Sequence, residues 1–493
     1  MIVVGTIILY FGVLLLLSRW IERRGVQMEN GEKGNENAAF FSGNHQSSWP
    51  LVAFGMIGAS ISGVTFIGVP GWVMGTDMTY LQMCLGFVVG YVVVAFVLLP
   101  LYYQHRFTSI YAYLNQRLGH ISYKTGASFF IMSKLLGAAA KFYVVCEILQ
   151  TCLSNTIAVP YALIVVVALL LIWLYTRRGG IRTLVWTDVV QTACLLLALL
   201  LILVRVATML DYSFAETVSA VWNDAHARIF EWSDFSSKQN FWKQFLSGIF
   251  VVIVMTGLDQ DMMQKNLTCK DLRSAQKDMC SYGVLFVPVN FLFLALGILL
   301  LMLYQQMGID VPAKGDELLA QIVMNGTLGQ ACLIFFTLGV IASAFSSADS
   351  ALTALTTSFC IDLLHREKDE RMRKHVHSGL LVVFFIVTLV FHWVGSGSVM
   401  DLIYTLVSYT YGPLLGLFAF GMFTRRHPRE SLVPYVVIAS PVICYIIDVA
   451  VRTTTGYQLG YELLMLNGLL TYVGLCWIAK SHDTVQEIGT VKK

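Results

Sequence analysis

Charged residues are scarce in this chain. Asp, Glu, Lys and Arg make up 13% of the 493 residues, whereas 57% of the residues are hydrophobic. An average soluble domain carries about 25% charged residues. Because a soluble core has no room for so many apolar side chains, lipid must surround much of this chain. The composition therefore predicts an integral membrane protein.

Several signatures of other protein classes are missing. The ten cysteines include no CxxC pair, and most lie in apolar runs, where cysteine behaves as a small hydrophobe. We therefore expect neither a disulfide framework nor a metal cluster. The sequence also lacks a Ser/His/Asp set and a phosphate-binding loop, which argues against an enzyme. The net charge of +3 gives no reason to propose a nucleic-acid partner.

Long apolar runs are abundant instead. A helix needs about 20 apolar residues to cross about 30 Å of hydrocarbon. A single segment that crosses lipid must be helical, because an open sheet edge would leave backbone groups without hydrogen bonds. The first run lacks the charged start and the cleavage site of a signal peptide, so we expect it to be retained. Numbered 0 to 12, the thirteen predicted spans are 2–20, 49–76, 79–104, 126–154, 157–176, 183–210, 241–264, 281–305, 329–364, 376–395, 399–423, 431–451 and 459–480.

The basic residues predict the orientation of these spans. About 25 of the 33 Lys and Arg residues fall on one set of loops and about five on the other. The rich set includes the Arg177–Arg182 cluster and the residues from Lys265 to Lys277. An odd number of spans with this asymmetry predicts an outside N-terminus and a cytoplasmic C-terminus, in a plasma membrane or bacterial inner membrane. Two outside segments, 211–240 and 306–328, are long enough for short surface helices.

Two spans contain glycines that interrupt a helix. Span 1 has glycine at Gly58 and Gly63, and span 6 has Thr256-Gly257 in mid-membrane. The two spans are five apart. Interrupted helices at matching positions of two halves indicate an inverted-repeat transporter with its binding site at the midplane. The alternative is that these glycines only allow close helix packing.

Spans 5 and 8 contain polar residues that are costly in lipid. Ser343, Ser346, Ser347 and Ser350 recur at helical spacing on one face of span 8, beside Asp349. Such serines can simply bond back to carbonyls one turn earlier, but the carboxylate also needs a cation or a proton. Asp188, near the start of span 5, either joins this site or caps a helix end.

Span 3 contains two lysines, Lys134 and Lys141, which are seven residues apart on one helix face. They either form internal ion pairs with carboxylates or anchor an anionic substrate. Asp259, just after the break in span 6, is expected to interact near the cytoplasmic end.

At these positions the chain resembles the sodium:solute symporter family, over residues 50–480. The matching motifs are Ser60-Ile-Ser-Gly-Val-Thr-Phe-Ile-Gly68, Gly179-Gly180 with Thr187-Asp188 and Gln191, Asp259-Gln260 with Gln264, Ser346-Ser347 with Asp362, and Ser408-Tyr409 with Pro413. The resemblance implies sodium-coupled symport by alternating access. It also implies an all-α LeuT-like five-plus-five inverted repeat of about 13 transmembrane helices. The parts would be an extra N-terminal helix (1–20), two repeats (49–210 and 241–423) and two C-terminal helices (431–480).

The resemblance also implies the ion sites. A sodium ion would bind backbone oxygens of Gly58 and Ile61, the carbonyl of Ser343 and the hydroxyls of Ser346 and Ser347. A second cation site, present in some members, would use Asp188, Ser346, Asp349 and Ser350. Members of the family have Ser or Thr where this chain has Asp349, and the added charge would tighten the site or take a proton.

For the solute, the sugar symporters match less well than the sialic acid symporters. The latter share hydroxyls in span 1 and a cation in span 3. The expected solute-binding residues are Ser60, Ser62, Thr65, Gln82, Lys134, Lys141, Met255, Thr256 and Tyr404. The expected solute is a small organic anion such as a sialic acid, carried by a monomer. The alternatives are a proton-coupled symporter with protons on Asp188 and Asp349, a membrane-embedded enzyme, or a sensor that has lost transport.

Overall fold

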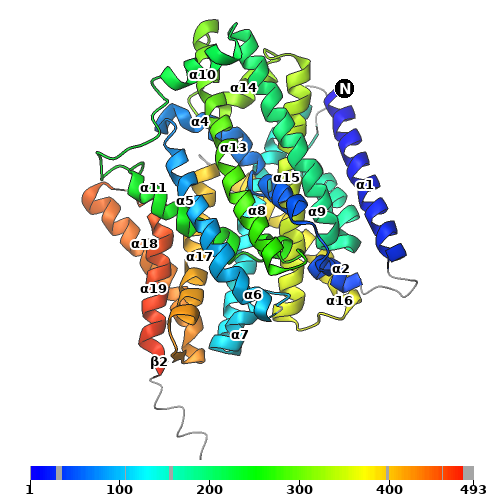
Figure 1. Cartoon of the computed structure of the whole chain (residues 1–493), viewed down its shortest axis with the longest axis vertical. Coiled ribbons are helices and arrows are strands. Elements are labelled where there is room, and N and C mark those ends of the chain that lie inside the picture. The colour runs from blue at the N-terminus through cyan, green and yellow to red at the C-terminus, as the bar shows by residue number, and fades with distance from the viewer. Residues whose placement is uncertain are drawn as a thin grey trace, which may run out of the picture.

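The computed structural model describes residues 2–28, 36–105, 107–154, 159–395, 399–457 and 459–480. Over these ranges the protein is a bundle of helices (Figure 1), and its one sheet is the two-residue antiparallel pair β1 (His427–Pro428) and β2 (Ala479–Lys480). The nine cysteines whose side chains the structure describes are free thiols. An all-α architecture is therefore confirmed.

The helices follow the predicted spans closely. In the first half they are α1 (Ile2–Met28), α2 (Glu36–Ser42), η1 (Gly43–His45), α3 (Trp49–Ser60), α4 (Gly63–Thr76), α5 (Tyr80–Val93), η2 (Val94–Leu98), α6 (Leu99–His105), α7 (Ala112–Leu118), α8 (His120–Ser154) and α9 (Tyr161–Met209). In the second half they are α10 (Phe214–Asn223), α11 (Phe241–Val252), η3 (Ile253–Gly257), α12 (Gln260–Asn266), α13 (Leu272–Met307), η4 (Gly315–Glu317), α14 (Leu318–Met324), α15 (Gln330–Ser358), η5 (Phe359–Leu363), α16 (Glu370–Val394), α17 (Val399–Phe423), η6 (Glu430–Leu432), α18 (Val433–Thr455) and α19 (Glu462–Ile478).

Within the described ranges, eight of these helical stretches are long and apolar enough to cross a membrane. Two bent helix pairs also qualify when each pair is taken as one span. Three shorter apolar helices cover Gly5–Ile21, Tyr161–Arg177 and Glu462–Ile478. The count of thirteen spans, the inverted repeat and its residue limits remain predictions.

Both predicted interruptions are real breaks. Helices α3 and α4 meet at an angle of 64°, and Ile61 between them has the non-helical angles φ −79° and ψ 87°. The segment formed by α11 and η3 meets α12 at 71°. The second break falls at Leu258 and Asp259, just past the predicted Thr256-Gly257. Each break begins a new helix with a capped first turn, because Ser62 accepts a hydrogen bond from the Thr65 amide and Asp259 from the Asp261 amide.

Glycine is required where helices approach closely. A Cβ on Gly58 would lie 2.1 Å from Thr192 Oγ1 of α9, so a side chain there would push α3 away from α9. Gly180 has φ +49° and lies against the ring of Phe40. This glycine kinks α9 between the predicted spans 157–176 and 183–210, which a loop was expected to join.

The start and the end of the described chain lie at opposite ends of the bundle, as expected for an odd number of membrane crossings. The start of α1 lies at the same end as α10 and α14, and β2 lies at the opposite end (Figure 1). Both segments that are predicted to lie outside, 211–240 and 306–328, contain the expected short helices. Helix α10 begins with a capping box, in which Ser213 and Glu216 bond to each other's backbone amides.

Candidate functional site

A cavity of about 150 Å³ lies beside both helix breaks. Its wall includes seven of the nine expected solute-binding residues: Ser60, Ser62, Thr65, Lys134, Lys141, Met255 and Thr256. The side chain of Tyr404 is outside the described residues. Residues from both interrupted spans therefore meet at one cavity, and solute binding there stays a prediction.

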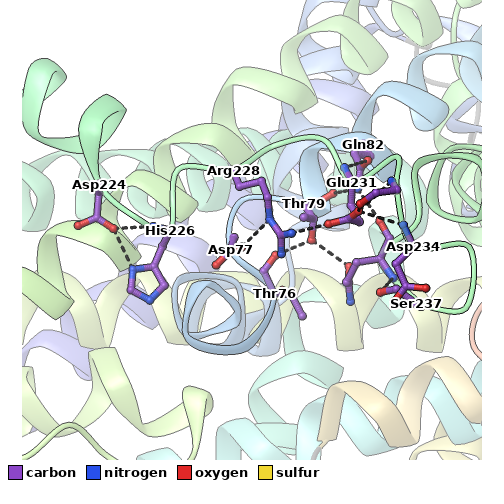
Figure 2. Close-up of polar contacts among 12 residues, drawn as sticks. Thr76, Asp77, Thr79, Gln82, Asp224, His226, Arg228, Glu231, Asp234 and Ser237 are labelled. Atoms are coloured by element: carbon purple, nitrogen blue, oxygen red, sulfur yellow. Dashed lines mark hydrogen bonds and ion pairs between the residues drawn. The ribbon is translucent and has the colours of Figure 1, made fainter.

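Gln82 is the exception, and its predicted role is wrong. Its amide nitrogen donates to the carbonyls of Thr79 and Gln239, and its amide oxygen accepts from the Glu231 amide at 3.0 Å. Figure 2 shows this network in the loop before α11. Tyr80 in the same first turn of α5 lines the cavity, but Gln82 lies on another face of the helix, so its side chain reaches this loop and not the cavity. It ties the loop to the bundle.

The same loop holds a charged cluster outside the spans. Arg228 pairs with Asp77 at 2.9 Å and also with Glu231 (Figure 2). The Ser233 hydroxyl donates to Glu231 at 2.6 Å, which lowers the pKa of that carboxyl. The cluster therefore holds the loop against the end of α4.

The ammonium of Lys134 forms ion pairs with two carboxylates. Its Nζ lies 3.0 Å from Asp259 Oδ2 and 2.8 Å from Asp261 Oδ2, and Tyr411 donates to Asp259 at 2.8 Å. The internal ion pair is therefore the correct reading for this lysine.

Lys141 differs from Lys134 although both lie on α8 and line the cavity. Within the described part of the chain, no ion pair or hydrogen bond joins Lys141 to another side chain. Glu147, the carboxylate on the same helix, instead contacts His392 at 2.5 Å. Lys141 is therefore the cation of the cavity that is left to meet a bound anion.

Aromatic residues complete the wall and were missed from the sequence. Tyr282 contacts the hydroxyl of Ser60 and accepts a hydrogen bond from Tyr91 at 2.7 Å. Tyr80, Phe87 and Tyr91 all line the cavity from α5. Their spacing of seven and four residues places them on one helix face, which is the signal that would have identified them.

The serine face of α15 lies against the first break. A Cβ on Gly63 would lie 3.3 Å from Ser343 Oγ, and Ser347 lines the cavity. The Ser347 hydroxyl donates to the Ser343 carbonyl at 3.1 Å. Hydroxyl and carbonyl oxygens suit a hard cation. The structure thus brings the break that contains Gly58 and Ile61 together with the serine face, as a sodium site there requires.

Besides Ser346 and Ser350, which were expected beside them, the two buried aspartates have partners that the sequence did not predict, Lys265 and Tyr175. Asp188 accepts from Ser346 Oγ at 2.6 Å, and its other oxygen lies 2.8 Å from Lys265 Nζ. The angles between Lys265 Nζ and this oxygen of Asp188 do not fit a hydrogen bond, so the contact is an ion pair. Asp349 accepts from Tyr175 at 2.6 Å and from Ser350 at 3.4 Å.

The placement of Lys265 corrects the sequence interpretation. It was counted among basic loop residues, but its side chain is 1% exposed. The predicted span 6 ends at residue 264, whereas α12 continues to Asn266. A lysine this deeply buried is stable only with compensating carboxylates, and Asp188 and Asp261 supply them.

Comparison with known proteins gives the family. The family model described as the sodium:solute symporter family matches residues 40–431. The human sodium/iodide cotransporter is 25% identical over 84% of this chain, and the match spans 65% of that protein. The sodium/sialic acid symporter SiaT of Proteus mirabilis is 22% identical over 87% of this chain and 86% of its own length.

A solved structure agrees on the fold. The structure described as the substrate-bound outward-open state of a sodium-coupled sialic acid symporter superimposes with a TM-score of 0.80. The superposition covers 97% of this chain and 99% of the other, at 18% identity. The chain therefore belongs to the sodium:solute symporter family, and it is a multi-pass membrane transporter that works by sodium-coupled symport.

Proposed function

We propose that this protein carries a small organic anion, such as a sialic acid, together with sodium. The observation that carries this proposal is the unpaired lysine of the cavity, Lys141. An ammonium removed from water is costly unless an opposite charge compensates it. A carboxylate on the solute would supply that charge. A neutral solute would leave the ammonium uncompensated.

Two further features support an anionic solute. Helix α4 begins at the cavity, where Ser62 and Thr65 line the wall. The positive end of its helix dipole therefore faces the solute, as the ends of broken helices do in other transporters. Related proteins are named for sialic acid and iodide, both of them anions.

Sodium would bind where the first break meets α15. The ligands would be the carbonyls of Gly58, Ile61 and Ser343 and the hydroxyls of Ser346 and Ser347. A cation there would hold the broken ends of α3 and α4 against α15. Since Ser60 and Ser62 belong to that break and line the cavity, sodium would fix the cavity wall and so favour solute binding. This arrangement would couple the two ligands.

The topology is part of the proposal. The N-terminus would lie outside and the C-terminus in the cytoplasm, with residues 49–210 and 241–423 as the two repeats. The basic-loop asymmetry and the opposite positions of the start of α1 and of β2 support this orientation. The protein would act as a monomeric carrier with no enzymatic step.

A binding screen tests the solute class. The purified protein would be heated with a panel of sialic acids, other carboxylates and neutral sugars, in sodium or choline chloride. A ligand of the folded state raises the unfolding temperature. We expect carboxylates to do so only in sodium, and Lys141→Met to lose the effect. The control Lys270→Met, at an exposed position, should keep it. Equal stabilisation by neutral sugars, or an unchanged carboxylate effect in Lys141→Met, would contradict the proposal.

A further inference from the structure

Two carboxylates, Asp188 and Asp349, are buried beside the serine face of α15. Their side chains are 1% and 0% exposed. Buried like charges repel strongly and need a positive partner. The broken span brings Lys265 Nζ to 2.8 Å from Asp188 Oδ2, while Asp349 accepts hydrogen bonds from Tyr175 and Ser350.

We infer that the ammonium of Lys265 takes the place of a second cation at Asp188, so that the protein binds one sodium ion per transport cycle. The inference rests on sodium-coupled symport and specifies its stoichiometry. It replaces the second cation site expected at Asp188, Ser346, Asp349 and Ser350.

The contacts of Asp188 leave no place for a second ion. One of its oxygens accepts the Ser346 hydroxyl, and the other faces Lys265 Nζ at 2.8 Å. A sodium ion bound to that second oxygen would lie next to a fixed ammonium in a buried site, and the repulsion would exceed any gain from the carboxylate. The residues therefore do not fit sodium while Lys265 is present.

A tethered cation also links the two binding regions. Lys265 lies 4.0 Å from Asp261, and Asp261 lies 2.8 Å from Lys134 in the cavity wall. Lys265 also pairs with Asp188, and Asp188 accepts a hydrogen bond from the Ser346 hydroxyl, which is a proposed sodium ligand. Lys265 is thus a positioning residue in a continuous polar chain from the sodium site to the solute cavity. A mobile second sodium would break that chain in each cycle.

Direct counting of bound sodium tests the inference without any solute. Purified protein would be equilibrated with radioactive sodium in alkaline choline buffer, where carboxylates stay ionised. We expect one sodium per molecule and a Hill coefficient near one for the natural chain. Lys265→Gln should bind two, because Asp188 is then uncompensated, and Lys265→Arg should bind one. The exposed control Lys270→Gln should also bind one.

Two results would overturn the inference. One is two sodium ions per molecule in the natural chain, which decides the matter even if Lys265→Gln is too unstable to purify. The other is a folded Lys265→Gln variant that still binds one ion. A chain that binds no sodium and shows no sodium-dependent transport would instead contradict sodium coupling itself. The double variant Asp188→Asn/Lys265→Gln, which leaves neither charge unpaired, should return to one ion, and two ions there would place the second site elsewhere.

Discussion

Lys134 of α8 and Asp259, the residue that caps α12, form an ion pair of 3.0 Å across the wall of the cavity. The pair fixes the second helix break to the neighbouring helix. Both side chains are largely removed from solvent, with exposures of 16% and 2%. This relationship explains why one lysine of the cavity holds the fold together, whereas Lys141 is the lysine that we propose meets the solute.

Removing Lys134 should therefore destabilise the protein. Lys134→Met leaves Asp259 and Asp261 without their shared cation, and breaking a buried pair costs about 3–5 kcal/mol. The measurement is the midpoint of thermal unfolding in detergent without solute, with Lys270→Met as the control. If Lys134→Met unfolds like the natural chain but loses solute affinity, Lys134 binds the solute and the ion-pair role is wrong.

The sodium site gives a second prediction. Ser346→Ala and Ser347→Ala each remove one hydroxyl ligand, and a buried charged group short of one partner loses on the order of 1–3 kcal/mol. The sodium concentration for half-maximal uptake should therefore rise several-fold or more.

A matched control lies on the same helix. Thr337 of α15 is buried and bonds back to the Leu333 carbonyl at 2.7 Å. Thr337→Ala should leave the sodium dependence unchanged. Wild-type sodium dependence in both serine variants would remove the proposed site from this face of α15.

The close contact of α3 with α9 gives a third prediction. Gly58→Ala would place a methyl group 2.1 Å from Thr192 Oγ1. Overpacking of this kind costs about 1–3 kcal/mol and would also shift the Gly58 carbonyl. We expect a lower unfolding temperature and weaker sodium dependence. Gly75→Ala, whose Cβ would meet no atom within 4 Å, is the control. A Gly58→Ala variant as stable and active as Gly75→Ala would disprove this packing.

Much of this architecture could be predicted because its signals are local. Apolar run lengths give the helices, and Gly58 and Gly63 mark a break within a few residues. The serine face also follows from spacing alone. The partners of Lys265 and Gln82 could not be predicted in this way, because each depends on a segment far along the chain.

The predictions for Lys265 and Gln82 failed for different physical reasons. Lys265 lies one residue beyond the predicted span end, where a lysine is ordinarily solvated, and only the packing of α12 against α9 brings Asp188 to it. Gln82 is on an apolar helix that does reach the cavity, but it lies on another face of α5 from the aromatic residues that line the cavity, Tyr80, Phe87 and Tyr91. The face of the helix, which an almost wholly apolar sequence does not reveal, therefore decided which groups Gln82 meets.

The orientation gives a fourth prediction, tested by cysteine labelling in intact cells. In a background without accessible native cysteines, a residue introduced at Ala313 should react with a membrane-impermeant reagent from outside. A residue introduced at Arg371 should react only after permeabilisation. The opposite pattern would reverse the proposed topology.

Transport itself tests the central claim most directly. Purified protein in liposomes would receive an inward sodium gradient, and uptake of a radiolabelled sialic acid or other carboxylate identified by the binding screen would be measured against a choline control. We predict accumulation that requires the sodium gradient, that is lost in Lys141→Met and that is retained in Lys270→Met. Accumulation driven equally well by a proton gradient at fixed sodium, or unaffected by the loss of Lys141, would contradict sodium-coupled anion transport through this cavity.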